Sequence, residues 1–111
     1  GFEVFTTKGQ TLSDPIADVF VNAISSEFPG ERRRVDTSDG DLDKEANFAI
    51  LKCKGAAILT ENFFMDNADD AKIMLSDSGQ SRIAIAHVNA ILKIEAEGVE
   101  MPKKKTRKSK K

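Results

Sequence analysis

The sequence predicts an α/β domain of the three-layer type, in which helices flank a mostly parallel sheet. Three observations lead to this prediction. At 111 residues the chain has room for one domain. Strand-like apolar segments are interspersed with amphipathic segments, in the order strand, helix, loop, two strands and two helices. The apolar runs in the middle of the chain do not alternate with polar residues, which is typical of parallel strands buried on both faces.

The first strand is predicted at residues 2–6, FEVFT. Phe2 and Val4 fall on one face of it, because side chains alternate along a strand. Glu3 and Phe5 fall on the other face. Phe, Val and Thr also favour strands, so composition and pattern agree.

The first helix is predicted to begin at Asp14 and Pro15 and to end before Pro29 and Gly30. An Asp at the start can accept hydrogen bonds from free amide groups, and proline fits the first helical position. The apolar residues in between recur at spacings of three and four: Ile16, Val19, Phe20, Ala23, Ile24 and Phe28. This stripe predicts one buried helix face.

The middle of the chain is predicted to hold a loop and two strands. Residues 31–47 are polar and irregular, so we expect a loop there. Two short apolar runs follow, FAIL at residues 48–51 and AAILT at residues 56–60. Each predicts a strand buried on both faces. Since four residues separate the two runs, a tight hairpin is an alternative arrangement of these strands.

Two helices are predicted in the last third of the chain, at residues 68–75 and 80–97. The second carries a broad apolar face formed by Ile83, Ile85, Val88, Ile91, Leu92 and Ile94. Gly98 ends it, since glycine commonly follows the last helical residue. We therefore expect a domain at residues 1–98 and a basic tail, expected to be disordered, at residues 99–111.

Basic residues concentrate at the C-terminal end. Residues 103–111, KKKTRKSKK, hold seven of the 17 Lys and Arg residues and no acid, so the other 102 residues carry 10 basic and 18 acidic groups, a net charge of −8. The tail has no aromatic residue to stack on bases, so we expect no specific nucleic-acid recognition. It is interpreted as a solubilising terminus or as a weak attractor of anionic polymers. No apolar run reaches the ~18–20 residues of a membrane span.

The chain offers few metal ligands. Cys53 is the one cysteine, which excludes an internal disulfide and a cysteine-based zinc site. His87 is the one histidine, and we expect a partly buried helix residue rather than a ligand. The acidic loop at residues 36–45 does not fit an EF-hand, because Gly40 lies between the first two alternating aspartates instead of after the third. The arginines at 32–34 are interpreted as partners in surface ion pairs.

Glu61 is the candidate catalytic residue. It directly follows the strand predicted at residues 56–60, and in open α/β sheets the functional crevice lies at the carboxyl ends of the strands. Phe63 and Phe64 come next and would partly desolvate a carboxylate at this place, which suits it to proton transfer. The alternative is that Glu61 and Asn62 merely lead into the next helix or cap it.

The segment around Glu61 carries a family resemblance. In AAILTENFFMDN, a strand ends in Glu and is followed by Asn, an aromatic residue and Asp-Asn before a helix. This pattern resembles the end of the catalytic domain of zinc-dependent N-acetylmuramoyl-L-alanine amidases, the family known as amidase type 3. Residues 1–20 are similar to the strand and helix that follow that family's last metal histidine. Residues 32–52 are similar to its variable loop and penultimate strand, and the resemblance covers residues 1–94.

The resemblance implies a peptidoglycan hydrolase that cleaves the amide between N-acetylmuramic acid and the L-alanine of the stem peptide. In such enzymes a zinc ion held by two His and one Glu polarises the scissile carbonyl and lowers the pKa of a bound water. A second Glu at the end of the last strand transfers protons, and Glu61 matches its position. The three zinc ligands are expected upstream of Gly1, so zinc is expected in the full-length enzyme and no metal ligand in this chain.

By the same resemblance, we expect this chain to be the C-terminal part of an amidase catalytic domain. The enzyme would act on peptidoglycan in the bacterial cell envelope or outside the cell, and this fragment alone would be inactive. A different class of function stays open, namely a non-catalytic module that binds the cell wall and uses the basic tail to attract an anionic wall polymer. A nucleic-acid-associated protein is the weakest alternative.

Overall fold

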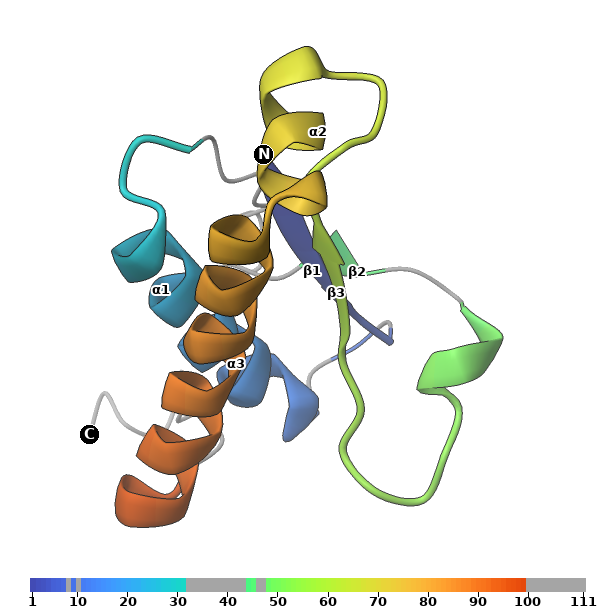
Figure 1. Cartoon of the computed structure of the whole chain (residues 1–111). Coiled ribbons are helices and arrows are strands. Elements are labelled where there is room, and N and C mark those ends of the chain that lie inside the picture. The colour runs from blue at the N-terminus through green and yellow to red at the C-terminus, as the bar shows by residue number, and fades with distance from the viewer. Residues whose placement is uncertain (8, 10, 32–43, 46–47, 100–111) are drawn as a thin grey trace, which may run out of the picture.

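The computed structural model describes residues 1–7, 9, 11–31, 44–45 and 48–99. In this part of the chain a small sheet has the strand order β2-β1-β3. Helices α1 and α3 lie side by side against the strands, and α2 lies beyond one end of the sheet (Figure 1). The predicted α/β class is confirmed. The predicted basic tail lies outside the described residues, apart from its first position.

The predicted mostly parallel, three-layer sheet is not found among the described residues. Strand β1 (Phe2–Thr6) pairs with β3 (Leu59–Asn62) in antiparallel orientation over four residue pairs. Its pairing with β2 (Lys44–Glu45) is parallel but covers two pairs. An antiparallel pairing of β1 and β3 cannot be predicted from apolar runs, because those runs carry no information about strand direction.

Strand β1 forms where the alternating pattern predicts it. The alternation of its apolar and polar side chains determines which face of the strand packs against the helices. Phe2, Val4 and Thr6 are fully buried on the face that α1 and α3 cover. Glu3 and Phe5 point to the opposite face, because successive side chains of a strand do so. The face of the sheet away from the helices is therefore the one that carries a carboxylate.

Helix α1 (Ser13–Glu27) confirms the helix predicted from the Asp14-Pro15 start. Asp14 is not its cap, however. It is fully buried, and its carboxylate accepts hydrogen bonds from the Thr6 hydroxyl at 3.1 Å and from the Thr11 N–H at 3.3 Å. Asp14 thus ties the start of the helix to the end of β1.

The strand predicted at residues 48–51 is wrong, because these residues form a short 3₁₀ helix, Ala49–Leu51. The N–H groups of Leu51 and Lys52 find local acceptors in the carbonyl groups of Phe48 and Ala49, at 3.1 and 3.0 Å. Leu51 is buried but Ile50 is 68% exposed, so the run has one buried side rather than two. The loop predicted at residues 31–47 also contains β2, which its polar composition did not indicate.

The strand predicted at residues 56–60 exists but is shifted, since β3 spans Leu59–Asn62. The Ala57 N–H donates to the Ser13 hydroxyl at 2.9 Å, so the residues before β3 are held by the start of α1 instead of by a neighbouring strand. As a consequence, Glu61 lies inside the strand and not behind it.

The two C-terminal helices confirm their predictions. Helix α2 (Ala68–Leu75) is capped by Asn67, whose side chain accepts from the Asp70 N–H at 3.0 Å. Helix α3 (Asp77–Glu97) begins three residues earlier than predicted, because the Ser76 hydroxyl accepts from the Gly79 N–H and caps it. It ends at Gly98, whose positive φ of 70° suits glycine.

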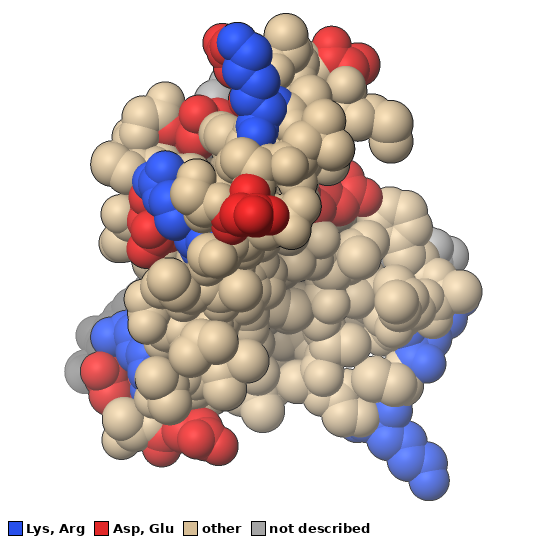
Figure 2. Space-filling model, in the orientation of Figure 1, with Lys and Arg blue, Asp and Glu red and all other residues tan. Residues whose placement is uncertain are grey.

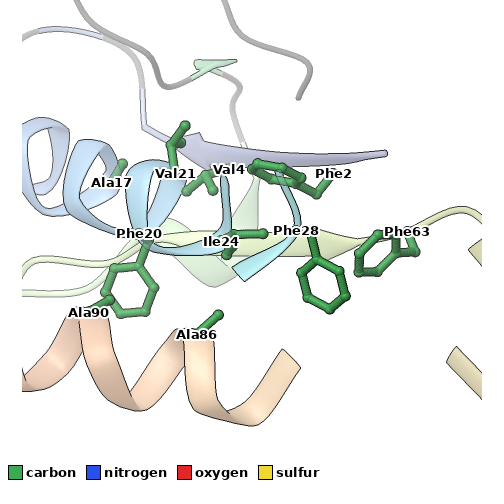
Figure 3. Close-up of a cluster of buried hydrophobic side chains, with 10 residues drawn as sticks. All are labelled: Phe2, Val4, Ala17, Phe20, Val21, Ile24, Phe28, Phe63, Ala86 and Ala90. Atoms are coloured by element: carbon green, nitrogen blue, oxygen red, sulfur yellow. The ribbon is translucent and has the colours of Figure 1, made fainter. Parts of the chain in front are cut away.

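The core lies between the sheet and the pair α1 and α3 (Figure 3). Its buried members are Phe2, Val4, Ala17, Phe20, Val21, Ile24, Phe28, Phe63, Ala86 and Ala90. The small side chains of Ala86 and Ala90 lie on α3 where it faces Phe20 of α1. Burial of the seven larger apolar side chains contributes on the order of 1.5–3 kcal/mol for each one.

The outer side of α3 is apolar as well. Four of its large side chains are about half exposed: Ile85, Val88, Ile91 and Leu92. Nevertheless, no helix among the described residues is long and apolar enough to span a membrane.

Candidate active site

Glu61 is the candidate residue that the structure places in the sheet. It is half-buried and is the third residue of β3. Because β3 runs antiparallel to β1, the carboxyl end of β3 lies beside the amino end of β1, where Phe2 pairs with Asn62. Glu61 was predicted to lie in a crevice at the carboxyl ends of parallel strands. Its observed position in an antiparallel pair is a different one.

The nearest ionisable neighbour of Glu61 in the sheet is Glu3. The two residues are directly opposite each other in the antiparallel register, so their side chains share one face of the sheet. Residues paired in this way have Cβ atoms about 4.5–5.5 Å apart. The structure thus brings a second carboxylate to the predicted catalytic one.

Lys44 of β2 completes this face. Its ammonium lies 2.8 Å from a carboxylate oxygen of Glu3 and 5.6 Å from the ring centre of Phe5. The ring of Phe48 packs edge-on against Phe5, with centroids 5.2 Å apart. The face opposite the helices therefore combines an ion pair, two aromatic rings and Glu61.

The turn after Glu61 is anchored by Phe63. This side chain is buried and packs edge-on against Phe28, with ring centroids 4.9 Å apart. Its backbone has a positive φ of 69°, in a region that bulky residues rarely adopt. The guanidinium of Arg82 covers Phe28 from α3, at 4.3 Å from the ring centre. Phe63 therefore anchors this turn in the core.

Asp70 holds the other end of the same turn. It is buried, and its carboxylate accepts from the Phe64 N–H at 3.0 Å. The Asp70 N–H in turn donates to the Asn67 side chain at 3.0 Å. Asp70 is thus a structural residue that links the turn after β3 to the start of α2.

His87 is half-buried in α3, as predicted. Its Nδ1 lies 2.8 Å from the Ile83 carbonyl oxygen, which can only accept, so Nδ1 carries the proton of the neutral ring. Its Nε2 then accepts from the Thr60 hydroxyl at 3.1 Å. Since Thr60 and Glu61 are consecutive in β3, this bond holds the strand on the face opposite Glu61.

A metal centre is not formed by the described residues. Among them, no three His, Cys, Asp or Glu side chains gather closely enough to hold a metal ion. Cys53 is free and exposed. Most of the acidic loop at residues 36–45 and the arginines at 32–34 lie outside the described residues.

The sequence reasoning missed Glu3 and Lys44. The alternation at residues 2–6 places Glu3 on the face away from the core, but the register that brings it to Glu61 has no local signal. Lys44 comes from a strand of two residues inside a polar segment.

Comparisons with known proteins support the family resemblance. The family model for N-acetylmuramoyl-L-alanine amidases, Amidase_3, matches residues 1–93. Among solved structures, an N-acetylmuramoyl-L-alanine amidase from Clostridium difficile 630 matches with a TM-score of 0.73 and 20% sequence identity. The match covers 89% of this chain and 50% of that one, so this chain spans about half the length of that enzyme. No curated protein matches in sequence.

The fold and the family model agree along nearly the whole described chain. The structural likeness is a likeness of fold, whereas the family model matches more than four-fifths of the sequence. On this ground, the chain belongs to the N-acetylmuramoyl-L-alanine amidase family known as amidase type 3.

Proposed function

We propose that this chain forms the C-terminal part of the catalytic domain of a peptidoglycan amidase. The reaction would be hydrolysis of the amide between N-acetylmuramic acid and L-alanine. The family match over residues 1–93 is the observation that carries this proposal. The 50% coverage of the C. difficile enzyme supports a partial domain.

Glu61 is proposed as the proton-transfer residue. As a general base it takes a proton from the attacking water, whose oxygen bonds to the carbonyl carbon. The same proton then passes to the nitrogen of L-alanine as the carbon–nitrogen bond breaks. Pairing of β3 with β1 fixes the backbone of Glu61, and the Thr60–His87 bond holds the strand from the other face. Both contacts hold the stretch of backbone that carries the proposed carboxylate.

Zinc enters this proposal through the family resemblance. The described residues do not form a zinc site by themselves. By the family resemblance, the zinc ligands are proposed to lie upstream of Gly1, and the metal would polarise the carbonyl and activate water. For the same reason, we propose that the 111-residue chain alone does not hydrolyse peptidoglycan.

The proposed place of action is the bacterial cell wall, since the family is named for a bond found in peptidoglycan. Peptidoglycan is correspondingly the proposed partner. An alternative proposal is a non-catalytic module that binds the wall. The basic residues at 103–111 favour this alternative, because seven positive charges on nine residues attract anionic polymers.

Substitution of Glu61 by Gln in the complete protein tests the proposed role. We expect release of muramoyl-linked peptides from purified peptidoglycan to fall by about 10²–10⁴-fold, which is the usual contribution of a general base. Glu95→Gln is the matched control, because Glu95 is exposed on α3. Peptide release by the Glu61→Gln protein at the rate of the unchanged enzyme would falsify the assignment.

A further inference from the structure

The outer face of α3 is apolar over the middle of the helix. Its large side chains are 47–56% exposed, and they are Ile85, Val88, Ile91 and Leu92. They recur at spacings of three and four residues, so they share one side of the helix. Ala86 and Ala90 face the core from another side. A helix that is apolar on several sides is normally buried, so this face of α3 lacks a packing partner among the described residues.

Helix α1 does not cover this apolar face. Arg82 of α3 pairs with Glu27 of α1 at 3.1 Å, and Lys93 lines the groove between the two helices. Arg82 and Lys93 are three turns apart and so mark one side of α3 as the side of α1. In the view of Figure 2, the surface over α3 and β3 is free of charged side chains at its centre. Apolar surface of this extent is typical of an interaction site.

Strand β3 has a free edge on the same part of the molecule. In the order β2-β1-β3 it has β1 on one side, and the described residues place no strand on the other. Edge strands of natural proteins are usually protected by charged residues, by proline or by a bulge. Residues 56–64, AAILTENFF, contain no proline and no charge besides Glu61. Such an edge can accept a further strand.

The free edge of β3 and the apolar face of α3 open in the same direction. Helix α1 packs against β1, and α3 is bonded to β3 through His87 and Thr60 at 3.1 Å. Strands and helices are thus stacked as two neighbouring units, β1 with α1 and β3 with α3 (Figure 1). We call the side beyond the second unit the open side. An α/β domain grows by repeating such units, so the open side is shaped for one more.

We propose that the open side is the surface on which the other half of the catalytic domain docks, with a strand added beside β3 and an apolar segment laid over α3. This inference rests on the proposed function, which makes this chain one part of a larger domain. The C. difficile enzyme supports this occupant, because half of its length has no counterpart in this chain. Docking there places the added strand next to the strand that carries Glu61.

Cysteine labelling of the complete protein tests the contact with α3. Leu92 and Lys93 are consecutive and both about half exposed, but Lys93 lies on the side of α1. Each is replaced by Cys in a Cys53→Ser background, since Cys53 is itself free and exposed. We expect a maleimide to label Leu92→Cys at least about tenfold more slowly than Lys93→Cys, because a covered thiol reacts only when the contact opens.

Hydrogen exchange of the complete protein tests the added strand. With β1 as the one neighbour, alternate amides of Leu59–Asn62 would donate to β1 and the others would exchange with water. With a strand on the open side, we expect all four amides to be protected. Protection of alternate amides alone would overturn the proposal.

Two results of the labelling experiment would also overturn it. Equal labelling of Leu92→Cys and Lys93→Cys would mean that the apolar face of α3 is uncovered. Protection that is lost on dilution of a dimeric protein would assign the face to a second copy of the chain. If Leu92→Cys does not fold, Ile85→Cys on the same face takes its place. The reaction is tested separately by Glu61→Gln, since labelling and exchange do not depend on activity.

Discussion

Phe63 has the most unusual backbone among the described residues. It is the one described residue other than glycine with a positive φ, and its ring is nevertheless buried against Phe28. A left-handed conformation costs a non-glycine residue about 1–2 kcal/mol. Packing of the ring offsets this cost, because loss of a buried Phe side chain costs about 3–5 kcal/mol. The residue after Asn62 is thus strained and held in place by the core.

This strain predicts an inverted order of stability for two variants. Phe63→Ala loses the ring and keeps the strain, whereas Phe63→Gly loses the ring and relieves the strain. We expect Phe63→Gly to be more stable than Phe63→Ala by about 1 kcal/mol, although glycine is usually the less stable of the two. Urea unfolding measures the difference. Equal stability, or an advantage for alanine, would show that the φ of Phe63 stores no strain.

At the scale of single residues, the sequence indicates Glu61 but not its surroundings. The resemblance singles out Glu61 by a local motif of strand, Glu, Asn and aromatic residue. Strand register places Glu3 opposite Glu61 and brings Lys44 into contact with Glu3, and register depends on side chains far apart in the chain. Local signals therefore find a reactive group more readily than the charges that surround it.

At the scale of elements, the helices were predicted well because their signals are local. The apolar stripe of α1 and the break at Gly98 after α3 depend on residues within one or two turns. The apolar run at residues 48–51 misled because its length fits a strand and a helical turn equally well. In this run the backbone N–H groups donate to carbonyl groups three residues earlier instead of to a neighbouring strand, and Ile50 is exposed.

The contact between α1 and α3 predicts how α3 responds to larger side chains. Ala86 is fully buried against α1, so Ala86→Leu should overpack the contact and cost about 1–3 kcal/mol. Ala84 is exposed on the same helix, so Ala84→Leu should change stability by no more than about 0.5 kcal/mol. Thermal or urea unfolding measures the stability of both variants. The substitution is the same in each, so the difference between them reports the site alone. Similar costs at both positions would contradict the observed packing of α3.

At the scale of the whole molecule, charge is divided unevenly along the chain. The tail at residues 103–111 holds seven positive charges, and the rest of the chain has a net charge of −8. On the face shown in Figure 2, acidic and basic side chains are interspersed around a broad centre without charge. The described surface on this face is therefore not a single-sign patch, and the tail carries the concentrated charge.

Deletion of residues 99–111 tests whether the tail attracts the wall. We expect retention on purified cell walls at low salt to fall several-fold, and the difference to vanish near 1 M salt, where screening acts over ~3 Å. A tail of equal length with its Lys and Arg residues replaced by Ser is the control for chain length. Unchanged retention of both variants at low salt would rule out electrostatic attraction.

The fold class was predictable at this scale, while the direction of the strands was not. Alternating strand-like and helical segments gave the α/β class and the order of the main elements. The antiparallel pairing of β1 with β3 follows from how the intervening segment returns the chain to the sheet. No pattern within either strand encodes that path.

This pairing has a consequence for folding. Phe2 pairs with Asn62, so the two strands enclose more than half of the chain as one closed loop. Because the entropy of closing a loop must be lost before its contacts form, such long-range pairing slows folding. Moreover, β1 is synthesised before β3, because the chain is made from its N-terminal end. A chain that stops before residue 59 has no partner for β1 in β3, so this part of the domain folds as a unit only after the second half has been synthesised.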